Sequence, residues 1–151
     1  MTKNYSSSRT LKVDWSRFHK DVGTLSEILA KKGPFERLVA ITRGGLGPAT
    51  LLAQMLDIKM VDTICISSYD DKIQRAGVPV LHKGLEGDGA GWLVVDDLAD
   101  SGRTLASVRQ MLPKAHIATV YGKPEGSPMV DSLAVPVEQS VWLIFPWDEM
   151  P

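Results

Sequence analysis

The stretch Trp92-Leu93-Val94-Val95-Asp96-Asp97-Leu98-Ala99-Asp100-Ser101-Gly102-Arg103-Thr104 decides the fold class of this 151-residue chain. It begins as a continuous apolar, β-branched run, which predicts a strand buried on both faces of a parallel sheet. Acidic and small residues follow, and after them comes a helical pattern formed by Leu105, Val108, Met111 and Leu112. A buried strand, a short turn and an amphipathic helix in this order indicate an α/β protein.

The turn between this strand and helix carries the groups expected of a site for a sugar phosphate. Gly102 permits close approach of the backbone, and Ser101 and Thr104 offer hydroxyl groups. The free N–H groups at the start of a helix attract a phosphate. Asp96 and Asp97 can accept bonds from sugar hydroxyls or bind a hard cation, since such cations take oxygen ligands. The alternative is an ordinary strand–helix turn with solvated acids.

The eleven residues from Val94 to Thr104 resemble the signature loop of the type I phosphoribosyltransferases, which use 5-phosphoribosyl-1-pyrophosphate (PRPP). The resemblance implies a mostly parallel central sheet flanked by helices, with a small hood. It also implies Mg²⁺ as the cofactor, with Asp97 as a metal ligand, and Asp100 as the catalytic general base. The residues of this loop that it assigns to PRPP are Asp96, Asp97, Ala99, Asp100, Ser101, Gly102, Arg103 and Thr104.

Length and composition narrow the class of protein. The length suits one domain, and 44% hydrophobic and 23% charged residues are ordinary for a globular protein. A net charge of −1 gives no reason to expect binding to nucleic acid or an anionic membrane. The single cysteine, Cys65, cannot form an internal disulfide, which favours a cytoplasmic location. No apolar stretch reaches the roughly 18 residues of a membrane span.

Periodicity predicts the remaining elements. Residues 1–10 are expected to be a flexible N-terminal arm and residues 11–151 a single phosphoribosyltransferase domain. Asp14 is a candidate N-cap for a helix whose apolar face comprises Trp15, Phe18, Val22, Leu25, Ile28 and Leu29, a face expected to be core. A helix is predicted over 46–56, and strands over 11–13, 37–41, 60–67, 78–81 and 116–121. Pro79 places the strand over 78–81 at a sheet edge or at its own start.

A second loop, Thr42-Arg43-Gly44-Gly45, follows the strand over 37–41. The two glycines indicate a sharp bend or close approach to a ligand, and Arg43 is suited to a phosphate oxygen. The loop resembles the pyrophosphate-binding loop of the same family, which assigns Arg43 and Gly44 to PRPP. In that family the bond after the arginine-equivalent residue is often a cis peptide, so the resemblance places any such bond at Arg43–Gly44.

Two further segments lack clear periodicity. The polar stretch 67–77 reads as a surface loop or, by its resemblance to the family, as part of a hood that closes over the reacting groups. The hood is expected to comprise 67–83 and 133–151, and within it Arg75 resembles a basic residue that reaches a PRPP phosphate. The glycine-rich stretch 84–91 precedes a strand, so it is interpreted as a hairpin connection and not a dinucleotide fingerprint.

The C-terminal third resembles the part of the 6-oxopurine phosphoribosyltransferases that binds the base. Lys123 follows a predicted strand and resembles the lysine that donates to the exocyclic oxygen, which would reject adenine. Trp142 resembles the aromatic residue that stacks on the purine, and Leu143 a residue whose backbone contacts the base edge. A surface lysine and a core tryptophan are the alternatives.

The resemblance therefore implies transfer of a phosphoribosyl group from PRPP to guanine, xanthine or hypoxanthine, by a homodimer or homotetramer. Two departures from the bacterial 6-oxopurine enzymes stand out. Arg103 replaces a glycine, and Ile144 and Phe145 replace polar residues, the first of them a glutamate beside the base. The second departure leaves the preference among the three purines open.

Two other classes remain open at this stage. One is a PRPP- or nucleotide-sensing regulator with the same fold and little transferase activity, against which Asp100 and Lys123 argue. The other is a phosphoacceptor receiver domain, which also pairs acids at a strand end. In a receiver domain the acid pair follows the first strand, whereas Asp96 and Asp97 lie two-thirds of the way along this chain.

Overall fold

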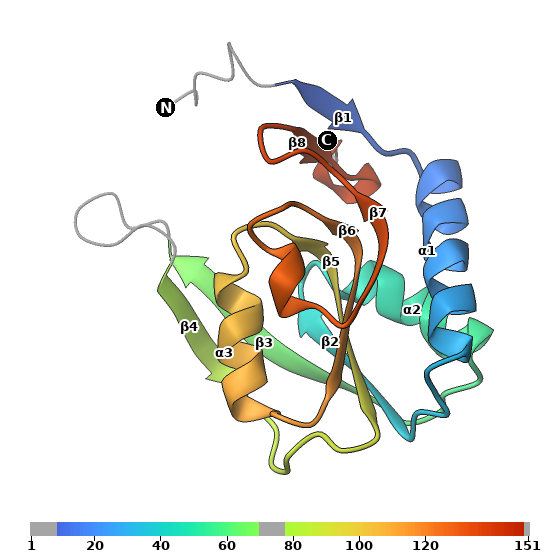
Figure 1. Cartoon of the computed structure of the whole chain (residues 1–151), viewed down its shortest axis with the longest axis vertical. Helices are drawn as coiled ribbons and strands as arrows, with labels where there is room; N and C mark the ends of the chain where they lie inside the picture. Colours follow the sequence, from blue (N-terminus) through green and yellow to red (C-terminus); the bar gives the residue numbers. More distant parts are fainter. Residues whose placement is uncertain (1–8, 70–77, 150–151) are drawn as a thin grey trace.

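The computed structural model describes residues 9–69 and 78–149 (Figure 1). The helices are α1 (Trp15–Ala30), α2 (Leu46–Met55) and α3 (Arg103–Met111), with short 3₁₀ turns η1 (Ser127–Met129) and η2 (Pro146–Glu149). The strands are β1 (Thr10–Lys12), β2 (Arg37–Thr42), β3 (Val61–Tyr69), β4 (Val78–Lys83), β5 (Trp92–Ala99), β6 (His116–Gly122), β7 (Ser132–Pro136) and β8 (Trp142–Ile144). The predicted α/β class is confirmed.

The main sheet has the strand order β4-β3-β2-β5-β6-β7. All neighbouring strands in it run parallel except β3 and β4, which are antiparallel. β4 is an edge strand, as Pro79 predicted. β5 lies in the middle of the sheet, so the acids at its end lie between the ends of β2 and β6.

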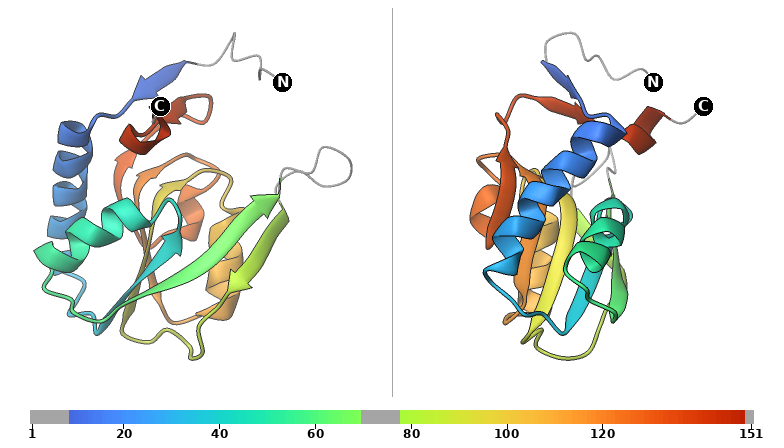
Figure 2. Two further views of the ribbon diagram at one scale, coloured as in Figure 1. Left: turned by 180° about the vertical axis from the view of Figure 1, so that it is seen from behind. Right: turned by 90° about the vertical axis from the view of Figure 1, so that its right-hand side faces the viewer.

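Helices cover both faces of the main sheet (Figure 2). The apolar side chains of β2 alternate: Leu38 and Ala40 pack with α1 and α2, whereas Val39 and Ile41 pack with α3. This alternation follows from the two-residue period of a strand. Burial on both faces explains why β2, β5 and β6 are almost continuously apolar in sequence.

A second, two-stranded sheet pairs β1 with β8 in parallel. Figures 1 and 2 show it beyond the end of the main sheet toward which the parallel strands run. Thr10, expected in the N-terminal arm, is part of β1. The described segments that were predicted to form a hood belong to two different sheets. β3, β4 and β7 hydrogen-bond within the main sheet, whereas β8 pairs with β1.

The first helix begins as predicted but buries less than predicted. Asp14 caps α1 by accepting a bond from the backbone N–H of Arg17 at 2.8 Å. Phe18 is fully buried, whereas Trp15 is 62% exposed, so its assignment to the core was wrong. Trp15 lies in the first turn of α1 and contacts Trp147 of η2, with ring centroids 6.0 Å apart. It therefore borders a cavity instead of the sheet.

The glycine-rich stretch 84–91 is a crossover, and its interpretation as a hairpin connection was wrong. β4 pairs with β3, and the chain then passes β3 and β2 to reach β5 on the far side of β2. The chain can make this connection because β4 runs antiparallel to β3 and therefore ends at the edge of the sheet where the parallel strand β5 begins.

Candidate active site

The adjacent acids Asp96 and Asp97 lie near the carboxyl end of β5. The backbone N–H of Asp97 donates to Oδ1 of Asp96 at 2.9 Å. Burial, with the neighbouring charge of Asp97, raises the pKa of Asp96 well above its ordinary value. Burial also raises the pKa of Asp97, and the carboxylate of Asp148 adds to this effect. Two acids held this close favour a ligand that supplies hydroxyl donors or positive charge.

The two acids line different cavities. Asp97 lines the larger one, of about 970 Å³, together with Arg43, Gly44 and Asp148. Asp96 lines a cavity of about 280 Å³ whose other residues are Leu98 to Leu105. The acid pair therefore marks the boundary between two spaces, and a ligand that contacts both acids can extend into each of them.

The smaller cavity is built by the turn that leads into α3. Gly102 has φ of 84°, a left-handed conformation that favours glycine, and a Cβ there would lie 2.9 Å from Cγ of Met129. Oγ of Ser101 accepts a bond from the backbone N–H of Arg103 at 3.4 Å. Ala99, Asp100, Arg103 and Thr104 line the same space. All the predicted PRPP residues of this loop except Asp97 therefore meet at one cavity, at the N-terminus of a nine-residue helix.

The loop after β2 approaches the end of β5 closely. A Cβ on Gly44 would lie 2.6 Å from Oδ1 of Asp97, and one on Gly45 would lie 2.5 Å from the carbonyl oxygen of Val95. Glycine is therefore required at both positions for contact with β5. A cis peptide bond is present, but it joins Thr42 to Arg43, so the expected position at Arg43–Gly44 was one bond too late. Neither bond involves proline, so no residue type marks the position in the sequence.

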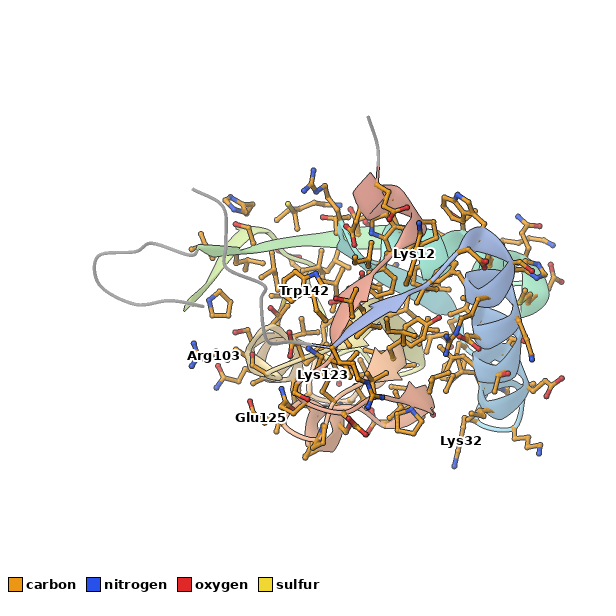
Figure 3. All side chains as sticks on the ribbon, turned by 90° about the horizontal axis from the view of Figure 1, so that it is seen from above. Lys12, Lys32, Arg103, Lys123, Glu125 and Trp142 are labelled. Atoms are coloured by element: carbon orange, nitrogen blue, oxygen red, sulfur yellow. The ribbon has the colours of Figure 1, made fainter. Side chains whose placement is uncertain are left out.

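Asp100 and Lys123, predicted as separate functional residues, form an ion pair. Nζ of Lys123 lies 3.2 Å from Oδ1 of Asp100, and the Lys123 side chain is only 6% exposed whereas that of Asp100 is 52% exposed. In Figure 3, Lys123 lies among other side chains, whereas the exposed Lys32 points away from the molecule. The backbone N–H of Lys123 donates to the carbonyl of Ala99 at 2.9 Å, which fixes the end of β6 against the end of β5.

Gln139 completes this network and was missed by the sequence analysis. Its Nε2 donates to Oδ1 of Asp100 at 3.3 Å, and its Oε1 accepts from the backbone N–H of Glu125 at 3.0 Å. Gln139 lies between β7 and β8 in a polar loop. No motif surrounds it, so only the folded chain identifies it as a partner of Asp100.

The remaining predicted purine residues lie on β8. Trp142 is 43% exposed, which excludes the alternative of a core tryptophan, whereas the side chain of Leu143 is buried. Lys123, Trp142 and Leu143 do not line the two cavities described above. Phe145 is buried and stacks on Trp147 with ring centroids 4.8 Å apart, so this departure from the family serves packing.

Some predictions fall outside the described part of the chain. Arg75 lies in residues 70–77, and the side chains of Ser68 and Tyr69 are likewise not described. Within residues 9–69 and 78–149, no group of three or more histidine, cysteine or acidic side chains could hold a metal by itself. In the same ranges no helix has both the length and the apolar character needed to cross a bilayer.

α/β proteins of this architecture bind phosphorylated ligands at the edge where the parallel strands end. Comparison with known families identifies the class further. The model of the phosphoribosyl transferase domain matches residues 8–150, and the chain belongs to this family. The resemblance found in the Asp96–Thr104 loop is thus confirmed over nearly the whole chain.

Curated relatives and solved structures agree with this membership. The chain is 49% identical over 140 residues to the xanthine-guanine phosphoribosyltransferase of Desulfotalea psychrophila, covering 93% of this chain and 87% of the relative. It is 52% identical over 136 residues to the enzyme of the same name from Chromohalobacter salexigens, covering 90% and 82%. A purine phosphoribosyltransferase structure from Pyrococcus horikoshii OT3 superposes with a TM-score of 0.78 at 27% identity, covering 94% and 96%.

Proposed function

We propose that this protein transfers the phosphoribosyl group of PRPP to a ring nitrogen of a 6-oxopurine in purine salvage. The bond between C1 of the ribose and the pyrophosphate oxygen breaks, and a bond from C1 to the purine nitrogen forms. Pyrophosphate leaves, and the purine N–H proton passes to a base. Relatives about 50% identical over most of the chain carry the name xanthine-guanine phosphoribosyltransferase, which supports this activity.

The observation that carries the proposal is the position of Asp96 and Asp97 between two cavities. A ribose whose hydroxyls bind these acids would send its 5′-phosphate into the smaller cavity, to Ser101, Gly102 and the N-terminus of α3. Its pyrophosphate would enter the larger cavity, beside Arg43 and Gly44. PRPP carries a phosphate at each end of the sugar, which matches this two-sided arrangement.

The purine would meet Lys123, Trp142 and Asp100. Lys123 would donate to the oxygen at position 6, Trp142 would stack on the ring, and the backbone of Leu143 would contact the base edge. Asp100 would accept the purine proton. The ion pair of Lys123 with Asp100 supports this assignment, since a purine that bonds to Lys123 lies within reach of Asp100.

The acid pair also fits Mg²⁺. Asp96 and Asp97 are half-buried beside each other, and burial is the main cause that raises the pKa of each. A hard cation takes carboxylate oxygens as ligands and would supply the positive charge that stabilises both in their ionised form. Asp97 is the proposed protein ligand, and PRPP oxygens and water would complete the coordination. Bound there, Mg²⁺ would supply positive charge that stabilises the departing pyrophosphate.

We also propose a cytoplasmic location and a homodimer or homotetramer. Support for assembly comes from large apolar side chains exposed on α2 and around the start of β3: Leu46, Met55, Met60 and Val61. Light scattering on the purified protein measures the assembly directly, and the mass of a single chain would refute it. Fractionation of the source cells would test the location.

One experiment tests the transferase. The protein is incubated with Mg²⁺, PRPP and guanine, xanthine, hypoxanthine or adenine, and nucleotide and pyrophosphate are both measured. We expect nucleotide from one or more of the 6-oxopurines and none from adenine, because the buried Lys123 favours a carbonyl over an amino group. PRPP binding without pyrophosphate release would refute the proposal in favour of a regulator.

A further inference from the structure

The larger cavity contains a histidine for which the proposed reaction has no use so far. His82 lines it together with Ser67, Arg43 and Asp97. Nε2 of His82 lies 2.7 Å from Oγ of Ser67, a hydrogen bond that joins β4 to β3 across the edge of the sheet. The bond fixes one nitrogen of the ring and leaves Nδ1 for another partner.

A β-bulge sets His82 apart from the rest of β4. Cys65 pairs with Lys83 and Ile66 pairs with Leu81, so the register skips His82. Lys83 anchors the end of the strand, because its Nζ donates to Oδ1 of Asp62 at 3.0 Å and to Oγ1 of Thr63 at 3.2 Å. Bulges beside binding sites redirect a side chain, and here the extra residue is the one that reaches the cavity.

A polyanion in this cavity needs more positive charge than Arg43 supplies. Arg43 approaches from the loop after β2, while Asp97 on β5 and Asp148 on η2 bring negative charge to the same space. A protonated imidazole can donate from both nitrogens, one to the hydroxyl oxygen of Ser67 and the other to a phosphate oxygen. His82 would then add a second cationic donor on the side of the cavity formed by β3 and β4.

We propose that His82, oriented by Ser67, is a further ligand for the pyrophosphate group of PRPP. This inference rests on the proposed function, because it requires that the larger cavity holds pyrophosphate. It gives β4, an edge strand of the main sheet, a role in holding the pyrophosphate that leaves in the reaction. The sequence alone gave no signal, since His82 and Lys83 follow the strand predicted over 78–81 and belong to no motif.

The test compares two ligands that differ in the pyrophosphate alone. PRPP with Mg²⁺ and ribose 5-phosphate with Mg²⁺ are titrated by calorimetry into the wild type and the His82→Gln variant. Loss of one charged hydrogen bond predicts a rise of about tenfold in the Kd of PRPP and no change for ribose 5-phosphate. His82→Lys retains a cation and should stay within about threefold of the wild type for PRPP.

Two additional variants sharpen the test. His19→Gln, an exposed position on α1 that does not line the cavity, should bind both ligands like the wild type. Ser67→Ala should weaken PRPP binding less than His82→Gln.

Unchanged PRPP affinity in His82→Gln would overturn the inference. Equal weakening of both ligands would overturn it too, since that result indicates a structural role. If His82→Gln fails to fold, Ser67→Ala decides, because loss of the hydrogen bond that orients His82 should raise the Kd of PRPP and leave that of ribose 5-phosphate unchanged. If the wild type binds PRPP but forms no nucleotide, the proposed function is refuted and the titrations still test His82. Failure of the proposed function is therefore distinguishable from failure of the inference about His82.

Discussion

Lys123 and Asp100 form an ion pair whose two partners differ strongly in exposure, and this difference predicts unequal costs of substitution. At 3.2 Å the gross attraction is about 5 kcal/mol for an effective dielectric constant near 20. Asp100→Ala leaves the ammonium group, 6% exposed, without its carboxylate and should lower the free energy of unfolding by about 3 kcal/mol. Lys123→Met leaves a carboxylate that is 52% exposed, which water can solvate, and should cost about 1 kcal/mol or less.

Urea unfolding followed by tryptophan fluorescence measures both values at neutral pH without ligands. Lys12→Met is the matched control, because the ion pair of Lys12 with Glu149 has side chains 65% and 47% exposed and should contribute less than about 0.5 kcal/mol. Figure 3 shows Lys12 on β1, away from Lys123. The reasoning fails if Lys123→Met destabilises the protein as much as Asp100→Ala, or if neither differs from the control.

Three other substitutions test the site. Because burial and the charge of Asp97 raise the pKa of Asp96, wild-type stability should fall as pH rises from the unfolded pKa of about 3.9 through the higher folded pKa. Asp96→Asn should remove the part of this decline that Asp96 causes, leave the part that the raised pKa of Asp97 causes, and increase stability at neutral pH, as urea unfolding across pH would measure. Gly44→Ala puts a Cβ 2.6 Å from Oδ1 of Asp97 and should lower kcat/KM for PRPP about a hundredfold in steady-state kinetics. Gln139→Ala should lower kcat about tenfold with little change in the KM of PRPP, because Gln139 hydrogen-bonds to Asp100 and would orient it. A raised KM for PRPP with an unchanged kcat would contradict that role.

The fold was predictable where burial alone determines the pattern. The apolar runs of β2 and β6 gave strand bounds within one residue of the structure, whereas β5 continues beyond its apolar run, through Asp96 and Asp97, to Ala99. The prediction of a hairpin connection at 84–91 was wrong, because pairing between distant segments decides the topology there. Whether β4 pairs with β3 or β5, and whether β8 pairs with β1, depends on hydrogen bonds that leave no local trace in composition.

The site residues likewise divide into those that the sequence could predict and those that it could not. Asp96, Ser101 and Thr104 are close in sequence and meet in one cavity because the strand–turn–helix unit is local. The contact of Gln139 with Asp100 spans 39 residues, and that of Ser67 with His82 depends on a bulge. Such contacts arise from tertiary packing, so single residues without a motif could not be assigned from the sequence.

The adjacency of the two acids on β5 places one in each of the two cavities. Successive side chains of a strand point to opposite sides, and residues two apart point to the same side. Asp96 and Asp97 are adjacent, and each lines a different cavity, while the charge of Asp97 remains near enough to raise the pKa of Asp96. An acid at position 98 in place of one at 97 would put both carboxylates on one side of β5 and leave the larger cavity without an acid from this strand. In the proposed binding mode of PRPP, adjacency of the two acids lets one ribose place a phosphate group on each side of β5. The variant that moves the acid, Asp97→Leu with Leu98→Asp, should therefore lose PRPP binding.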